Sequence, residues 1–336
     1  MKNQQIVVVT GATAGVGRAT ARAFARQGAF VALLARDEER LKQTEREVTS
    51  LGGKALSISV DVANADDVEQ AAEQVERNVG PIDVWVNNAM VTIFSPIEEI
   101  TPEEFKRVTE VTYLGTVHGT MSALKRMRAR NSGAIVQVGS ALAYRSIPLQ
   151  SAYCGAKHAI RGFTDSVRSE LLHDRSDVHI SMVQLPGVNT PQFEWCRSKI
   201  SKHPQPVGRI YEPEVAARAI VLASQHKRRE IYVGWTSAVT ILANKLVPGF
   251  LDKYVANHAY EQQFTPEKVP VNRPNNLFKP VPTKYRAHGS FGNRAHSISP
   301  QLWLSFNRGK VGALLAMLSA AAIWHYRPRK NRLYRS

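Results

Sequence analysis

A tyrosine and a lysine stand four residues apart in the stretch AYCGAK, at Tyr153 and Lys157. Residues 151–173 have the spacing of a helix, so we expect both side chains on one helix face. A phenol with its ordinary pKa of about 10 is a poor base at neutral pH, but an ammonium group one turn away favours the phenolate and lowers that pKa. Tyr153 is therefore a candidate general acid/base, and Lys157 is the candidate charge that lowers its pKa. By itself such a pair is more often a packing feature, so the surrounding sequence decides whether the pair is catalytic.

The segments around this pair alternate in type from Ile6 to Gly234. Seven short apolar runs are separated by longer amphipathic stretches; they read IVVVT, FVALLA, KALSISV, IDVWVNNA, GAIVQVGS, VHISMVQLPG and EIYVG. Runs that are apolar throughout fit strands buried on both faces. The alternation predicts an α/β fold, a Rossmann-type doubly wound parallel sheet of about seven strands with a C-terminal extension.

A glycine-rich turn, TGATAGVG, follows the first predicted strand and opens a helix. Its glycine spacing differs from the common dinucleotide fingerprint, but it would equally let the backbone approach a pyrophosphate at a helix N-terminus. The predicted cofactor contacts are Thr10, Gly11, Thr13, Ala14, Gly15, Val16 and Gly17. The alternative is a glycine turn without a ligand, which the strand-to-helix context makes less favoured.

Arg36 follows the second predicted strand, whose end reads LLARD. A site selective for NAD usually has an acid at this strand end, which binds the ribose 2′-hydroxyl. Here that position is Ala35, and the neighbouring guanidinium suits a 2′-phosphate, so NADP(H) is favoured over NAD(H). Two alternatives stay open: Arg36 as an ordinary exposed arginine, and Asp37 as either the displaced acid or the N-cap of the next helix.

The composition limits the class of protein. The chain has 336 residues, of which 43% are hydrophobic, enough for a full core. Its two cysteines, Cys154 and Cys196, form no metal-binding pattern, so we expect neither a disulfide framework nor a metal site. The first residues run straight into a strand without a secretory signal. We therefore expect a cytoplasmic protein in a reducing compartment.

The net charge of +16 is concentrated at the C-terminal end. No Asp or Glu follows Glu267, whereas thirteen Lys and Arg do. This tail lacks closely interleaved aromatic and basic residues and carries no recognition motif, so nucleic acid is not an expected partner.

Three segments are predicted along the chain. Residues 1–260 would form an NADP-binding catalytic domain, residues 261–310 a Pro/Asn-rich extended basic segment, and residues 311–336 an apolar run with basic flanks. The run itself, 311–324, is fourteen residues long, short of the roughly 20 that span a bilayer as a helix. Three interpretations stay open: a tail that associates with anionic membranes, which is favoured, a helix that docks on the body or on a second subunit, and a poorly ordered tail.

Six motifs occur in one order along residues 4–235: Thr10-Gly11-x-x-x-Gly15-x-Gly17, Asp61-Val62, Asn87-Asn88-Ala89, Ser140, Tyr153-x-x-x-Lys157 and Pro186-Gly187. With this set, the chain resembles the short-chain dehydrogenase/reductase (SDR) family over roughly two thirds of its length. Each motif falls at the carboxyl end of a predicted strand or at the start of the next helix, the edge where open parallel sheets bind ligands.

The resemblance implies a role for individual residues. It makes Tyr153 the general acid/base, Lys157 its tuning charge and a ligand of the nicotinamide ribose, and Ser140 a hydrogen-bond partner of the substrate oxygen. It adds further cofactor contacts, at Asp61, Val62, Asn88, Ala89, Pro186, Gly187 and Val188. The implied reaction interconverts an alcohol and a carbonyl by hydride transfer, with Tyr153 protonating the developing alkoxide during reduction. The resemblance also implies a dimer or tetramer built partly on the helix that carries Tyr153.

Two positions depart from the family pattern. Met90 stands where a glycine usually follows Asn-Asn-Ala, so its side chain must lie beside the cofactor or in the substrate pocket. Thr112 stands where the family commonly has an asparagine that supports a water-linked proton relay to the lysine. A hydroxyl can hold a water with fewer hydrogen-bonding groups than an amide, so we expect an altered relay.

Substrate selection is expected in three segments that overhang the same edge, residues 90–94, 141–147 and 188–211. The candidate pocket residues are Met90, Leu142, Tyr144 and Phe193, and the same segments also supply Ile93, Phe94, Ile147 and Trp195. Charged residues are sparse there until Arg197, which predicts an apolar alcohol or carbonyl substrate. The leading prediction is an NADP-dependent oxidoreductase. The alternative is a catalytically altered SDR-fold protein that binds nucleotide as a regulator or scaffold, tethered by its basic tail.

Overall fold

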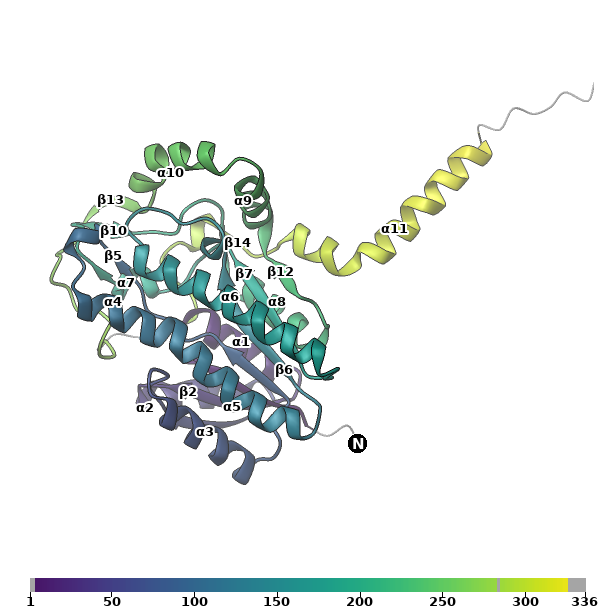
Figure 1. The fold of residues 1–336 in the computed structure, drawn as a ribbon, viewed down its shortest axis with the longest axis horizontal. Helices are drawn as coiled ribbons and strands as arrows, with labels where there is room; N and C mark the ends of the chain where they lie inside the picture. The colour runs from purple at the N-terminus through teal and green to yellow at the C-terminus, as the bar shows by residue number, and fades with distance from the viewer. Residues whose placement is uncertain (1–3, 283–284, 326–336) are drawn as a thin grey trace, which may run out of the picture.

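Seven parallel strands form the central sheet of the computed structural model, which describes residues 4–282 and 285–325 (Figure 1). They are β1 (Ile6–Thr10), β2 (Phe30–Ala35), β3 (Lys54–Ser59), β4 (Val84–Asn87), β6 (Ala134–Ser140), β7 (His179–Leu185) and β12 (Glu230–Tyr232). Their order across the sheet is β12-β7-β6-β4-β1-β2-β3. The Rossmann-type sheet predicted from the apolar runs is confirmed.

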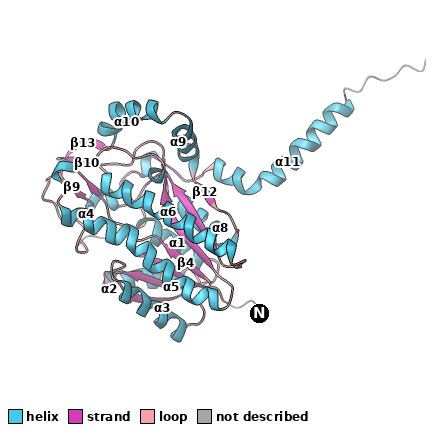
Figure 2. Ribbon diagram, viewed as in Figure 1, coloured by secondary structure: helices cyan, strands magenta, loops and turns pink. Residues whose placement is uncertain are grey.

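Helices cover both faces of this sheet (Figure 2). Those of the body are α1 (Gly15–Ala25), α2 (Glu38–Ser50), α3 (Ala65–Asn78), α4 (Pro102–Val108), α5 (Gly115–Ala129), α6 (Ser151–His173), α7 (Gln192–Trp195) and α8 (Pro213–Gln225). Alternate residues of β1 enter two different cores: Val7 packs with Phe24 of α1, and Val8 packs with Val75 of α3. Burial on both faces is the physical reason why the inner strands are mostly apolar, whereas the edge strand β3 is largely half-buried.

Small sheets and turns build the rim above the carboxyl ends of these strands. The strands are β5 (Ile93–Phe94), β8 (Gly187–Val188), β9 (Arg197–Ser198), β10 (Lys202–Pro204), β11 (Ile210–Tyr211), β13 (Phe264–Lys268) and β14 (Ala295–His296). The short 3-10 turns are η1 (Ile97–Glu99), η3 (Ala141–Ala143) and η4 (Gly292–Arg294), and η2 (Thr109–Leu114) is a π-helical turn. The π-helical turn η2 separates α4 from α5.

The C-terminal extension begins with two helices, α9 (Gly234–Leu246) and α10 (Pro248–Gln262), which part at Pro248. The segment after α10 is irregular over much of its length, as its prolines predict, but it packs tightly on the body. Leu277 and Val281 are both almost completely buried, and β14 pairs with β11 of the body. The segment is therefore a part of the fold and not a free linker.

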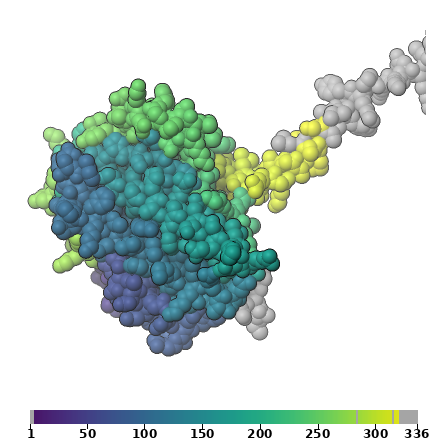
Figure 3. Space-filling model, in the orientation of Figure 1, coloured from purple at the N-terminus to yellow at the C-terminus, as the bar shows by residue number. Residues whose placement is uncertain are grey.

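The last helix, α11 (Pro300–His325), joins the body through its first turns. Leu302 is buried there, and Arg228 donates a hydrogen bond to the Ser305 carbonyl oxygen at 2.9 Å. Further along, Met317 and Leu318 are exposed, and the helix projects away from the body (Figures 1 and 3). Among the residues that the structure describes, no helix has both the length and the apolar character needed to cross a membrane. The basic residues predicted to flank the apolar run on its C-terminal side, beyond residue 325, lie outside the described residues.

Candidate active site

A cavity of about 510 Å³ lies at the carboxyl edge of the sheet. It opens where β1 stands between β2 and β4, the point at which the strand order reverses and a crevice forms in sheets of this kind. Ser140, Tyr153 and Lys157 all line this cavity, together with the glycine turn. The predicted catalytic triad and the predicted cofactor turn therefore face one space.

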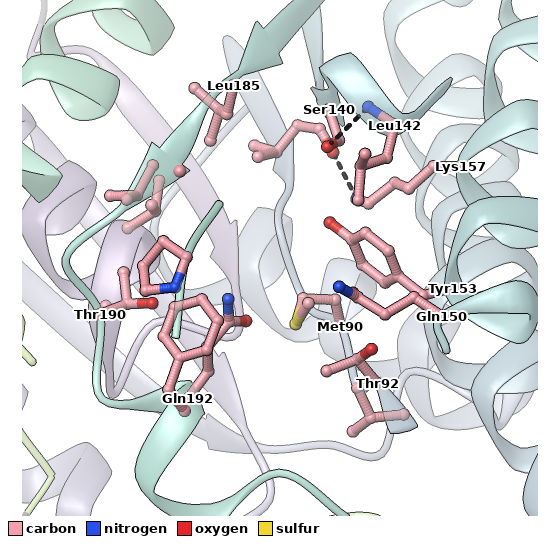
Figure 4. A pocket seen from close by; sticks show the side chains of 18 of the residues that line it. Met90, Thr92, Ser140, Leu142, Gln150, Tyr153, Lys157, Leu185, Thr190 and Gln192 are labelled. Carbon is pink, nitrogen blue, oxygen red and sulfur yellow. Dashed lines mark hydrogen bonds between the residues drawn. The ribbon is translucent and has the colours of Figure 1, made fainter. Parts of the chain in front are cut away.

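The three predicted catalytic side chains come from β6 and α6 and converge on this cavity (Figure 4). Ser140 is the last residue of β6, and its Oγ accepts a hydrogen bond from the Leu142 amide at 3.1 Å. Tyr153 and Lys157 follow one another by one turn near the start of α6, with the Lys157 Nζ 5.6 Å from the centre of the Tyr153 ring. The same Nζ donates a hydrogen bond to the Val138 carbonyl oxygen at 2.7 Å, which fixes the ammonium group beside the phenol.

Burial controls the protonation of this pair. It raises the pKa of Tyr153 above its ordinary value and outweighs the hydrogen bond with Ser140, which acts in the opposite direction. Burial also lowers the pKa of Lys157 to about 8. The expected lowering of the Tyr153 pKa is therefore wrong for this structure, because loss of hydration opposes the charged form of each group. At neutral pH, Tyr153 is protonated and suited to donate a proton.

The glycine turn has the backbone that a close approach requires. Gly11 and Gly15 have φ angles of +65° and +52°, in the left-handed region that favours glycine. A Cβ atom on Gly17 would lie only 2.2 Å from the Gly11 carbonyl oxygen. No side chain caps the N-terminus of α1 at Ala14, so the helix presents main-chain amides and its positive end toward the cavity, as a pyrophosphate requires.

Most of the predicted cofactor residues line the cavity. They are Gly11, Thr13, Ala14, Gly15, Val16, Arg36, Asp61, Val62, Asn88, Ala89, Tyr153, Lys157, Pro186, Gly187 and Val188. Thr10 and Gly17 stand behind this lining. The Thr10 Oγ1 accepts hydrogen bonds from the amides of Asn88 at 2.9 Å and Ala89 at 3.0 Å, so it ties the end of β1 to the loop after β4.

Arg36 is partly buried at the end of β2, and its terminal nitrogens donate hydrogen bonds to two main-chain carbonyls. Asp37 is the N-cap of α2, because its carboxylate accepts a hydrogen bond from the Arg40 amide at 3.0 Å. Of the two interpretations of Asp37, the structure therefore supports the helix cap. Asp61, on the neighbouring strand end, is paired with Arg107 at 2.5 Å.

Comparison with known proteins decides the family. Residues 5–200 match the family model described as short chain dehydrogenase. The chain is a short-chain dehydrogenase/reductase. The uncharacterized oxidoreductase YxnA of Bacillus subtilis is 35% identical over 261 residues, which cover 77% of this SDR and 73% of YxnA.

Two further proteins resemble parts of this SDR. A 3-dehydrosphinganine reductase of Danio rerio is 34% identical over 192 residues, which cover 56% of this SDR and 57% of that protein. The crystal structure of a metagenomic short-chain oxidoreductase in complex with NADP has 30% sequence identity and a TM-score of 0.58, covering 68% of this SDR and 96% of that chain. The family and its oxidoreductase class are thus shown.

Thr112 lies in the π-helical turn of this SDR and does not line the cavity. Its side chain is completely buried, and its hydroxyl both accepts from the Val91 amide at 3.1 Å and donates to the Val91 carbonyl oxygen at 2.9 Å. Its visible role is to hold the loop that carries Met90. A proton relay through Thr112 stays a prediction.

Tyr144 does not belong to the pocket, and that prediction is wrong. Its hydroxyl donates a hydrogen bond to the Glu230 carboxylate at 2.6 Å, and the Arg161 guanidinium lies 4.0 Å from the centre of its ring. Its ring packs with Ile241 of α9, outside the cavity lining. A buried tyrosine places its hydroxyl on a polar partner, and here that partner lies on β12.

The other predicted pocket residues, Met90, Leu142 and Phe193, line the cavity, as do Ile147 and Trp195. Ile93 and Phe94 are instead buried in the core. Sequence reasoning missed the side chains that α9 and α10 add, namely Thr236, Ser237, Thr240, Leu251, Tyr254, Val255, Ala259 and Gln262. The only signal for them was the helical spacing of apolar residues, which does not say which surface a helix covers.

One group of possible metal ligands occurs among the described residues, formed by Glu212, Glu214 and His288. His288 lies 3.0 Å from Glu214, an ordinary polar contact, and none of the three lines the cavity. The absence of a metal site stays a prediction.

Proposed function

We propose that this SDR is an NADP(H)-dependent oxidoreductase that interconverts a carbonyl and an alcohol on an apolar substrate. The observation that carries the proposal is the convergence of Ser140, Tyr153 and Lys157 with the glycine turn on one cavity. The metagenomic SDR solved in complex with NADP supports the choice of cofactor.

When bound, NADPH would supply hydride to the carbonyl carbon in the direction of reduction, and the glycine turn, Arg36 and Lys157 would hold it. The Tyr153 hydroxyl donates its proton to the carbonyl oxygen as negative charge develops there, and the Ser140 hydroxyl donates a hydrogen bond to the same oxygen. The Lys157 ammonium stabilises the phenolate that Tyr153 becomes, and the Val138 carbonyl holds it in place. Burial raises the pKa of Tyr153, so its hydroxyl carries the proton that reduction requires at neutral pH.

The substrate end of the cavity is mainly apolar. Met90, Leu142 and Phe193 face it, and α10 adds Leu251 and Val255. Such a lining suits an apolar ketone or alcohol and would hold water away from the reacting atoms.

We expect Arg36→Ala to weaken NADPH binding by about tenfold or more, because charge-assisted hydrogen bonds to a 2′-phosphate contribute roughly 1.5–3 kcal/mol. NADH binding should change little, since NADH lacks that phosphate. The measurement is a titration of each nucleotide followed by nicotinamide fluorescence. Arg46→Ala is the matched control, because it removes the same charge from an exposed position of α2.

Equal weakening of NADPH and NADH in Arg36→Ala would contradict the assignment of Arg36. If wild-type protein bound neither nucleotide, the proposed reaction would fail as a whole. Tight NADPH binding without turnover of any apolar ketone or alcohol would instead support the alternative, a nucleotide-binding regulator or scaffold.

We also propose that α9, α10 and α11 bring this SDR to an anionic lipid surface. Apolar side chains at helical spacing are exposed on α9 and continue onto the other two helices; they are Trp235, Val239, Leu242, Leu246, Phe250, Tyr254, Trp303, Met317 and Leu318. Exposed cations stand among them, at Lys245, Lys253, Arg308 and Lys310. Figure 1 shows α11 leaving the body beside α9. Apolar residues with interspersed cations are typical of helices that lie in a membrane interface.

We expect Leu246→Glu and Phe250→Glu each to reduce binding to vesicles by about tenfold, because each loses a side chain whose burial contributes roughly 1.5–3 kcal/mol. Vesicles of phosphatidylcholine with about 30% phosphatidylserine should bind the wild type better than phosphatidylcholine alone. Co-sedimentation measures both effects. Leu172→Glu is the control, since Leu172 is 72% exposed but lies on α6. Equal loss in this control, or a wild type that does not sediment, would contradict the proposal.

A homo-oligomer built partly on α6 stays a prediction.

A further inference from the structure

Residues 275–282 and 285–291, here called the strap, run along the edge of the cavity where the proposed dinucleotide would lie. Three of its residues, Asn276, Pro280 and Tyr285, line the same cavity as the glycine turn and Arg36. The family match ends at residue 200, so it says nothing about this segment.

The strap is joined to the glycine turn and to the first turn of α1 by hydrogen bonds to its main-chain carbonyls. The Gly15 amide, at the start of α1, donates to the Arg286 carbonyl oxygen at 3.0 Å. Arg18, one turn further along α1, donates from Nη1 to the Tyr285 carbonyl oxygen at 2.6 Å. The strap thus lies directly against the end of α1 that would face a pyrophosphate.

The strap also holds the arginine proposed to recognise the 2′-phosphate. Arg36 donates from Nη1 to the Phe278 carbonyl oxygen at 2.9 Å and from Nη2 to the Asn276 carbonyl oxygen at 2.8 Å. A guanidinium carries about five N–H donors, so these two bonds leave donors for a phosphate. Because a held side chain loses less conformational freedom on binding, such contacts increase affinity through preorganisation.

The ring of Tyr285 contacts both α7 and α2. One face of its ring stacks on Trp195 of α7, with centres 4.5 Å apart and planes at 18°. The Arg40 guanidinium of α2 lies 4.0 Å from the centre of the same ring, and Arg40 also donates to the Val281 carbonyl oxygen at 2.6 Å. Removal of this ring would therefore cost the strap its stacking contact with α7 and its cation–π contact with α2.

We propose that the strap is a part of the dinucleotide site and that Tyr285 is a positioning residue for cofactor selectivity. Tyr285 holds the Asn276 and Phe278 carbonyls against Arg36, and the oriented Arg36 then discriminates NADPH from NADH. The inference rests on the proposed function, in which Arg36 faces the 2′-phosphate.

A double-mutant cycle tests this role. The dissociation constants of NADPH and NADH are measured by nicotinamide fluorescence for the wild type, Tyr285→Ala, Arg36→Ala and the double variant. We expect Tyr285→Ala to weaken NADPH binding by about tenfold in the wild type and by less than about twofold in the Arg36→Ala background, since two residues that act as one unit are not additive. NADH binding should change by less than about twofold in every variant.

Two further variants separate positioning from general stability. Tyr285→Phe keeps the stacked ring and should bind NADPH within about twofold of the wild type. Ile298→Ala removes an exposed apolar side chain beyond the strap and outside the cavity lining, and it should leave both dissociation constants unchanged. If Tyr285→Ala unfolds, which its melting temperature shows, Tyr285→Leu takes its place in the cycle.

Equal weakening of NADPH and NADH, or the same loss in both backgrounds, would overturn the proposal, because a purely structural role predicts either result. Tighter NADPH binding in Tyr285→Ala would overturn it as well, since the strap would then compete with the phosphate. If the wild type bound neither nucleotide, the proposed function would fail before the strap was tested, so the two failures are distinguishable.

Discussion

Tyr153→Phe should lower kcat for carbonyl reduction by about 10³-fold, because it removes only the proton that the developing alkoxide receives. The ring remains, so the packing of α6 is kept. NADPH binding should stay within about twofold of the wild type, since the hydroxyl contributes to the transition state more than to the ground state. The measurement pairs steady-state turnover of an apolar ketone that the wild type reduces with a nucleotide titration.

Tyr144→Phe is the control for this experiment. It removes the hydroxyl of another tyrosine, but one that is bonded to Glu230 outside the cavity. Its kcat should therefore remain close to that of the wild type, even if the protein melts at a lower temperature. A Tyr153→Phe variant that retained more than about a tenth of the wild-type kcat would contradict a proton donor at this position.

The pH dependence of kcat/KM should report the ionisation of Lys157. Burial lowers the pKa of this ammonium to about 8, so its charged form is present below that pH and is lost above it. Reduction needs the charge to stabilise the phenolate left on Tyr153, so kcat/KM should be constant near neutral pH and fall by about tenfold per pH unit above the pKa. Tyr153 does not titrate in this range, because burial raises its pKa.

Lys157→Arg provides the comparison, since a guanidinium keeps its charge throughout this range. Its kcat/KM should be lower than that of the wild type, because the side chain is bulkier, but it should stay level across the same pH interval. A wild-type profile that remained level to about pH 9.5 would contradict the role assigned to Lys157.

The strands and the catalytic helix could be predicted because their signals are local. A strand buried on both faces is mostly apolar, and the seven apolar runs mark all seven strands of the central sheet. Tyr153 and Lys157 could be paired because four residues make about one helical turn. In the same way, α6 has the bounds expected from sequence.

The rim of the site could not be predicted, because distant tertiary contacts position it. The side chain of Tyr144 is directed by Glu230, 86 residues away, and the Arg36 guanidinium is held by Phe278, 242 residues away. The pKa of Tyr153 departs from the expectation for a related reason: the spacing to Lys157 is visible in the sequence, whereas the loss of hydration is not. A residue pattern gives the identity of such groups but not their surroundings.

The hydrogen bond between Arg18 and Tyr285 spans 267 residues and has a consequence for biosynthesis. A ribosome produces the glycine turn among the first residues and the strap only when most of the chain is complete, so the nucleotide-binding half is made long before its rim. Early domains generally fold while later ones are still being synthesised. The entropic cost of closing a loop rises only slowly with the length of the loop, so the hydrogen bond between Arg18 and Tyr285 can still form late. We therefore expect the nascent protein to acquire its sheet first and its cofactor selectivity last.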